Sequence, residues 1–225
     1  MHKLGLIAAA ALTATAVPAS ATAVMYNGNS YNPGDTINIS FTGVQDSDLH
    51  ATLALLFTGV SGSDYVFHYT LTNTSNPADE ASSTATAFGF NTDPNPDVGD
   101  SSATGSFTNV SSGSISGGTH VEICATGGPN CAGAANNGDM IGGGSFTGDL
   151  DIAFGSLPDT LTLSQPIVRF QSTGLNGNGS DIATPVGAPP LPEPATWAMM
   201  MVGFGATGVA MRRTRRRKGL LPQAA

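Results

Sequence analysis

Basic side chains are scarce in this sequence, and almost all of them lie near its two ends. Of the eight Lys and Arg residues, Lys3 is near the start, six fall within 212–218, and only Arg169 lies between them. Residues 24–191 contain 15 of the 16 acidic residues, so their formal charge is −14. Nucleic-acid binding needs Lys and Arg to neutralise phosphates, so this class is excluded. Binding to anionic lipid or to an acidic polysaccharide by charge attraction is excluded for the same reason.

Recognisable catalytic signatures are missing as well. Residues 24–191 contain no Gly-x-Ser-x-Gly, His-Glu-x-x-His, P-loop or Gly-x-Gly-x-x-Gly pattern. The single tryptophan, Trp197, lies outside this stretch, which therefore has no indole to stack on a sugar ring. We expect a protein that is not an enzyme and needs no cofactor. The alternative is a secreted hydrolase that uses Asp149 and Asp151 as paired carboxylates, or His120.

The N-terminus has the features of a secretory signal peptide over residues 1–23. Lys3 supplies the positive start, residues 4–16 form a mostly apolar run, and Ala21 and Ala23 form an Ala-x-Ala cleavage site. We therefore expect export across the inner membrane and a mature chain that begins at Val24.

The C-terminus combines a rigid motif, an apolar run and a basic cluster in residues 192–218. Residues 195–211 have no charge, and a helix of this length would span about 25 Å, enough to cross a bilayer core. Six of the seven residues in 212–218 are basic, so this end should stay in the cytoplasm and the rest of the chain outside. Pro192 and Pro194 favour an extended segment just outside the membrane, where a processing enzyme can bind it.

This tail resembles the PEP-CTERM sorting signal of Gram-negative bacteria. The residues that match the motif are Pro192, Glu193, Pro194, Trp197 and Ala198. The resemblance implies recognition by a membrane-embedded exosortase, transient anchoring in the membrane, cleavage near Pro-Glu-Pro, and transfer to the cell surface or the extracellular matrix. Association with exopolysaccharide or a biofilm is expected for such cargo. The alternative is a plain membrane anchor in which the Pro-Glu-Pro sequence occurs by chance.

Cysteine occurs only twice, as Cys124 and Cys131. In an exported chain, a disulfide is expected for such a pair. Closing so short a loop should stabilise the protein by roughly 2–3 kcal/mol. The alternative is a metal site made by His120 together with the two cysteines.

Oxygen ligands gather at Asp93, Asn95 and Asp97, with the 1-3-5 spacing of a calcium loop. Gly99 falls one place late for an EF-hand, and Thr104 stands where the bidentate glutamate would be. An exposed turn is favoured, and a calcium-dependent binding module is the alternative.

Alternating apolar and polar residues predict an all-β fold for the body, residues 24–174. The pattern is clear over 35–42, 49–57 and 64–73, which should form an antiparallel sheet. Further strands are expected over 84–90, 103–110, 119–125, 146–154 and 160–171, with an edge or a break at Pro166. The eight or nine strands predict a β-sandwich or jelly roll.

Residues 175–191 are rich in Gly, Asn and Pro and are expected to form a flexible tether. The body also resembles the cistern family of PEP-CTERM proteins, in residues 67–75, 87–91 and 121–124, together with Cys131. That resemblance implies a secreted β-rich protein and no known chemistry.

Overall fold

The computed structural model describes residues 22–80, 82–116, 118–133, 144–174, 177 and 179–187. These residues form strands and connecting turns, with no helix among them. The strands are β1 (Ala23–Tyr26), β2 (Asn29–Tyr31), β3 (Thr36–Gly43), β4 (His50–Ser61), β5 (Asp64–Asn73), β6 (Thr84–Asp93), β7 (Ser102–Ala103), β8 (Asn109–Ser116), β9 (Thr119–Thr126), β10 (Ser145–Ile152), β11 (Thr160–Thr173) and β12 (Gly179–Pro185). All twelve belong to one compact unit, which ends at Pro185.

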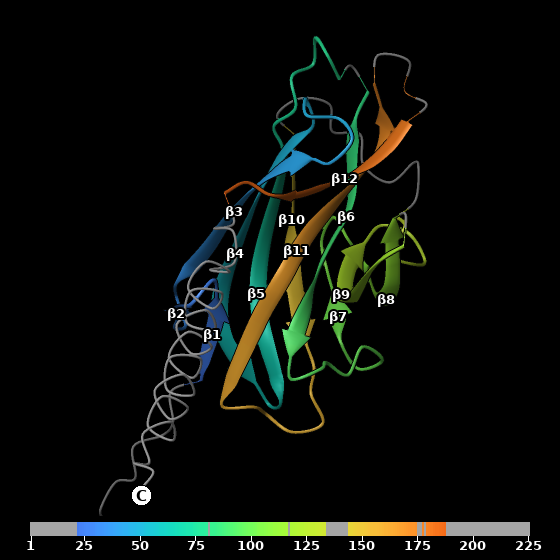
Figure 1. The fold of residues 1–225 in the computed structure, drawn as a ribbon. Coiled ribbons are helices and arrows are strands. Elements are labelled where there is room, and N and C mark those ends of the chain that lie inside the picture. The colour runs from blue at the N-terminus through green and yellow to red at the C-terminus, as the bar shows by residue number, and fades with distance from the viewer. Residues whose placement is uncertain are drawn as a thin grey trace, which may run out of the picture. The chain divides into compact units, whose positions relative to one another are not determined.

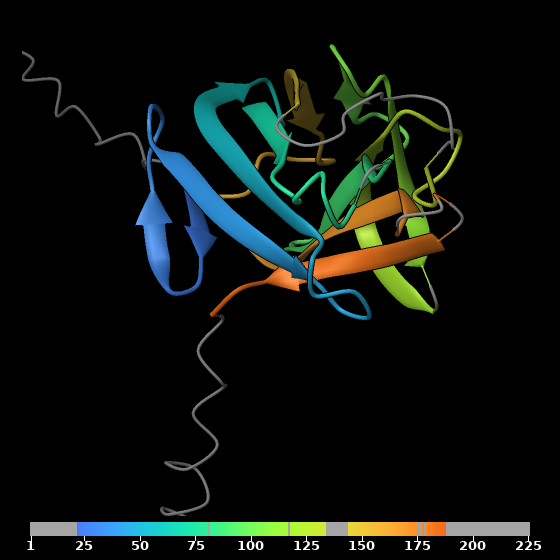
Figure 2. The ribbon, with the colours of Figure 1, turned by 90° about the horizontal axis from the view of Figure 1, so that it is seen from above.

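The strands form one continuous sheet in the order β7-β10-β5-β4-β3-β12-β11-β6-β9-β8. Neighbours on this path are antiparallel, while β1 pairs with β11 in parallel and with β2 in a short hairpin. The sheet curls until its end strands β7 and β8 lie near each other, so it is nearly closed (Figures 1 and 2). An antiparallel all-β fold is therefore confirmed, with twelve strands in place of eight or nine.

The long strand β11 explains why the fold is one sheet and not two packed sheets. Its 14 residues pair with β6 along one edge, and with β1 and then β12 along the other. Pro166 does not end this strand, because the ladder to β6 skips it in a register shift between Ser164 and Ile167. Gln165, just before the proline, has a positive φ of 48° within the same irregularity. The expected break at Pro166 is thus a bulge inside a continuous strand.

The predicted tether over 175–191 is wrong for residues 179–185, which form β12. This strand lies between β3 and β11 and pairs with both. Ala183 is fully buried and Asp181 is 2% exposed. Gly, Asn and Pro are rare in strands, so the composition of this region did not predict one. Strand β12 forms because it pairs with its two neighbours in the sheet.

The interior holds one large apolar core, built by the period-2 segments found in the sequence. Every second residue of β3, of β4 as far as Phe57 and of β5 points inward, and the aromatic rings of Tyr65, Phe67 and Tyr69 are fully buried. Phe88, Phe107 and Phe146 join them from other parts of the sheet in a chain of ring contacts. This core fixes the sheet, and the outward side chains define the possible sites.

Candidate functional site

The predicted address residues lie almost entirely outside the described part of the chain. This holds for Ala21 and for the sorting motif, Pro192, Glu193, Pro194, Trp197 and Ala198. Ala23 is described as the first residue of β1, and its N–H donates to the Asp159 carbonyl at 3.4 Å. No helix within the described ranges is long and apolar enough to span a membrane, and residues 195–211 lie beyond them.

The predicted disulfide is present between Cys124 and Cys131, whose Cα atoms are 5.7 Å apart. Both sulfurs are joined in this bond, so neither is free as a thiolate ligand and the metal site with His120 is overturned. The two cysteines belong to a second buried apolar cluster that includes Ile167 of β11, and just after the disulfide the Gln171 side-chain amide donates to the Ala132 carbonyl at 2.9 Å. The disulfide therefore holds the loop between Cys124 and Cys131 in place at the end of β9.

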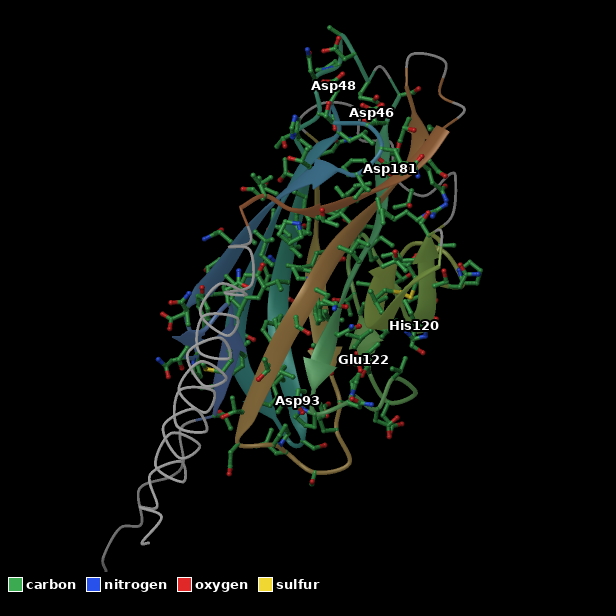
Figure 3. The ribbon with its side chains drawn as sticks, in the orientation of Figure 1. Asp46, Asp48, Asp93, His120, Glu122 and Asp181 are labelled. Atoms are coloured by element: carbon green, nitrogen blue, oxygen red, sulfur yellow. A yellow bond between two sulfur atoms is a disulfide. The ribbon has the colours of Figure 1, made fainter. Side chains whose placement is uncertain are left out.

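Of the residues of the alternative hydrolase site, Asp149 and Asp151 lie on the same outward face of β10, whereas His120 lies on another part of the sheet. Asp149 on β10 lies with its Oδ1 2.8 Å from His68 Nδ1 on β5, and both side chains are about half exposed. Asp151, two residues along the same strand, accepts a hydrogen bond from the Ser102 hydroxyl at 3.4 Å. Burial raises the pKa of Asp151, while the Ser102 bond lowers it and the charges of Asp64 and Asp149 raise it. His120 is exposed on β9, which is not a neighbour of β10 in the sheet (Figure 3).

The candidate calcium residues lie at the end of β6 and in the turn that follows it. Asp93, Asn95 and Asp97 are all exposed. The Asp97 carbonyl accepts hydrogen bonds from the Ser101 N–H and hydroxyl, and the Asp97 N–H donates to the Ala153 carbonyl at 2.7 Å. In the described ranges, no group of three or more His, Cys, Asp or Glu side chains is arranged to hold a metal ion.

Strands β6 and β9 are joined by hydrogen bonds between side chains and backbone groups that involve one acidic residue, Glu122. The Glu122 carboxylate on β9 accepts from the Thr92 N–H at 2.6 Å, and the Glu122 N–H donates to Asn91 Oδ1 at 3.0 Å. Asn91 Nδ2 also donates to Gln165 Oε1 at 2.9 Å, beside the bulge of β11. Figure 3 shows Glu122 and Asp93 near the same end of the sheet. These bonds are structural.

Arg169, the one Lys or Arg of the body, donates a hydrogen bond to a backbone carbonyl and does not pair with a carboxylate. Its Nη1 donates to the Ile115 carbonyl at 2.7 Å, and its Nε has no hydrogen-bond partner. Burial lowers the pKa of this guanidinium. Among the residues that the structure describes, the only carboxylate within 4.0 Å of a basic nitrogen is that of Asp149, beside the ring of His68. Arg169 thus secures strand β8 on the outward side of β11.

A cluster of four carboxyl groups, which we call the carboxyl cluster, was missed by the sequence analysis. It consists of Asp46 and Asp48 in the β3–β4 loop, Glu80 before β6, and Asp181 on β12 (Figure 3 labels three of them). Asp181 Oδ2 accepts from the Gln45 and Asp46 N–H groups at 2.8 and 2.9 Å. Glu80 is 1% exposed, and its Oε2 accepts from the Gly174 N–H at 2.7 Å.

Two acids of the carboxyl cluster, Glu80 and Asp181, are buried. Burial is the largest effect on Glu80 and raises the pKa of its carboxyl, and the Asp46 hydrogen bond and the Asp46 and Asp48 charges raise it further. The Gly174 N–H bond lowers it. No local sequence signal marks this group, because its members come from positions 46, 48, 80 and 181.

The outward side of β3, β4, β5 and β10 forms a second feature, which we call the hydroxyl face. Ser40, Thr52, Thr72 and Ser145 lie side by side across the four strands, and the next row is Asn38, Ala54, Thr70 and Thr147. All of these residues are exposed or half-buried, and none is charged. Thr72 and Ser145 are joined by a 2.8 Å hydrogen bond between their hydroxyls.

Comparison with known proteins gives one match, in the tail. The family model of the PEP-CTERM protein-sorting motif matches residues 190–217. No curated protein matches the chain significantly, and no solved structure does so. The resemblance of the body to the cistern family therefore stays a prediction. The chain carries a PEP-CTERM protein-sorting motif, which implies export, sorting by an exosortase and delivery to the cell surface.

Proposed function

We propose that the body is a non-enzymatic component of the extracellular matrix and that its hydroxyl face binds a neutral exopolysaccharide. The hydroxyl face carries the proposal, because it is an uncharged, mostly polar array that crosses four neighbouring strands of the described sheet. Hydroxyl and amide groups both donate and accept hydrogen bonds, as the hydroxyls of a sugar polymer do. The charge of −14 on residues 24–191 disfavours an acidic polymer.

The geometry of the face suits a repetitive partner. Neighbouring strands lie about 4.8 Å apart, and residues two apart along a strand about 6.7 Å apart, so the side chains form a regular grid. Each hydrogen bond to a solvated hydroxyl adds roughly 1 kcal/mol or less. Binding would therefore depend on many weak contacts along one polymer chain.

The test replaces three hydroxyls of the face by methyl groups, in a T52V/T70V/T147V variant. Valine keeps the shape and the strand preference of threonine, so the fold should be retained. A matched control, T108V/T119V/T160V, makes the same change at three exposed threonines outside the face. Co-sedimentation with neutral polysaccharide purified from the producing cells should fall several-fold for the first variant and stay unchanged for the control. Equal binding by the two variants would contradict the proposal.

The non-enzymatic character needs its own measurement. The full chain and its processed form are incubated with glycoside and ester substrates, and we expect no product. Hydrolysis that is lost in an Asp149→Asn or a His120→Ala variant would establish a hydrolase instead.

A further inference from the structure

The hydroxyl face continues, one row further along the same four strands, into a row with different chemistry. Thr36 on β3 pairs with Leu56 on β4, Leu56 pairs with His68 on β5, and His68 pairs with Asp149 on β10. These four residues, which we call the mixed row, alternate along their strands with residues of the core and therefore lie on the outward side of the sheet. A polymer that lies on the hydroxyl face would meet the mixed row next.

The middle of the mixed row presents a small apolar surface. Leu56 lies directly across from His68, and Val66 lies two positions before His68 on the same side of β5. Leu56 and Val66 are half-buried, and the His68 side chain is 46% exposed. An imidazole has an apolar body and polar nitrogens, so these three side chains can pack against the C–H groups of a sugar ring.

Carboxylates beside this apolar surface supply hydrogen-bond acceptors. Asp149 Oδ1 lies 2.8 Å from His68 Nδ1, and its Oδ2 accepts from the Thr104 hydroxyl at 3.5 Å. Asp151, two positions along β10, accepts from the Ser102 hydroxyl at 3.4 Å. Within the part of the chain that the structure describes, no lysine or arginine nitrogen lies within 4.0 Å of either carboxylate. Both therefore keep lone pairs that can accept from the hydroxyls of a ligand.

We propose that the mixed row seats one sugar ring of the polysaccharide, with the C–H face of the ring on Leu56 and His68 and its hydroxyls donating to Asp149 and Asp151. This inference rests on the proposed function, because the rest of the polymer lies on the hydroxyl face. Hydrogen bonds to a carboxylate are about twice as strong as those between neutral groups, so the seat anchors the polymer. It also names the sugar as a neutral pyranose with free hydroxyls, since an acidic sugar would be repelled by the two carboxylates.

The arrangement of the two carboxylates favours binding of the ring over hydrolysis of the polymer. Glycoside hydrolysis needs a pair of carboxyl groups that flank the bond to be cut. Asp149 and Asp151 both project from the outward side of β10, so both would approach a seated ring from the sheet below it. The seat therefore agrees with a protein that holds the polymer without cutting it.

The first test measures how fast diethyl pyrocarbonate modifies each histidine of the full chain, purified in detergent, as followed by mass spectrometry of its peptides. The probe is the neutral polysaccharide purified from the producing cells. We expect the polysaccharide to slow the modification of His68 several-fold. His120 is an internal control, because it is exposed on β9, outside the hydroxyl face and the mixed row, and its modification should not change.

The second test uses two variants, Leu56→Thr and Asp149→Asn, in the co-sedimentation assay. Threonine keeps the strand preference at position 56 and removes the apolar surface, while asparagine keeps the shape at position 149 and removes the charge. Each should weaken binding of the polysaccharide several-fold. The matched controls are Leu157→Thr in the β10–β11 connection and Asp100→Asn before β7, both at exposed positions, and they should bind as the natural protein does.

The outcomes separate the seat from the proposed function. The seat is overturned, and the proposed function stands, if the T52V/T70V/T147V variant loses binding while His68 is not protected and L56T binds normally. A natural protein that does not bind the polysaccharide at all overturns both. Protection of His68 that grows with protein concentration in the absence of polysaccharide would show that a second copy of the chain covers the mixed row, and would also overturn the seat.

Discussion

Tyr69 offers the sharpest test of how the curled sheet is held together. Its ring is fully buried, and its hydroxyl donates to the Thr104 carbonyl at 3.0 Å and accepts from the Phe107 N–H at 2.9 Å. Thr104 and Phe107 lie in the loop that joins β7 to β8, the two ends of the sheet path. Burial is the main reason that the pKa of this hydroxyl is raised, so it stays neutral. One oxygen atom therefore anchors the connection that brings the sheet ends together.

Tyr69→Phe removes this oxygen and leaves the ring in place. The Phe107 N–H then loses its partner in a fully buried position, which costs about 1–3 kcal/mol, while Thr104 is an exposed residue whose carbonyl we expect to find water instead. We expect the free energy of unfolding to fall by about 2 kcal/mol. A loss of that size is a large fraction of the stability of a typical domain.

Tyr65→Phe is the matched control. Tyr65 is equally buried, but its hydroxyl makes one bond, to the half-buried Pro158 carbonyl at 2.9 Å. Water can replace that bond, so we expect a loss of only about 0.5–1 kcal/mol. Urea unfolding followed by circular dichroism measures both variants, because the single tryptophan lies in the tail and does not report on the body. A loss for Tyr69→Phe no larger than that for Tyr65→Phe would refute the anchoring role of the Phe107 bond.

Four more predictions address the body and the tail. A chain ending after Thr173 should fail to give a cooperative unfolding transition, whereas one ending after Gly187 should keep it, because β12 pairs with both β3 and β11. Replacing Cys124 and Cys131 by Ser should lower the free energy of unfolding by about 2–3 kcal/mol, and a reductant should not destabilise that variant further. Asp181→Asn should lower it by about 2 kcal/mol in urea titrations, because the amide cannot accept all three N–H groups that Asp181 holds. Changing residues 192–194 to Ala should leave the melting temperature unchanged and abolish processing and surface delivery, as followed by cell fractionation.

The sequence predicted those strands in which apolar and polar residues alternate along the strand itself. β3, β4 and β5 follow one another as antiparallel neighbours, and each buries alternate residues on the same side of the sheet. Their period of two is sufficient to locate most of their residues. The disulfide was equally predictable, because the exported chain has only two cysteines and they lie seven positions apart.

The β1–β2 hairpin was missed although the sequence contains its signal. Asn27 and Gly28 both have positive φ, at 49° and 76°, as the tightest hairpin turn requires. An Asn-Gly pair between two short strands is a recognised mark of such a turn. The two strands have only four and three residues, so neither is long enough to show a period of two by itself.

The carboxyl cluster could not have been predicted from any local pattern. Asp181 lies in a stretch rich in Gly, Asn and Pro, and Glu80 follows a turn with no apolar periodicity. Their burial results from the sheet order, which places β12 between β3 and β11 and brings the β3–β4 loop over both. A buried acid of this kind is visible only when the non-local pairing is known.

The position of β12 changes where the body ends and the sorting signal begins. The sorting-motif match starts at residue 190, only five positions after β12 ends at Pro185. Because β12 is an inner strand of the sheet, the body cannot complete its hydrogen bonding until the residues just before the motif are available to it. Processing near residues 192–194 leaves this strand intact, whereas cleavage anywhere within 175–185 would remove all or part of it. A processing enzyme that releases a folded body must therefore act within the narrow stretch that follows Pro185, which is where the motif lies.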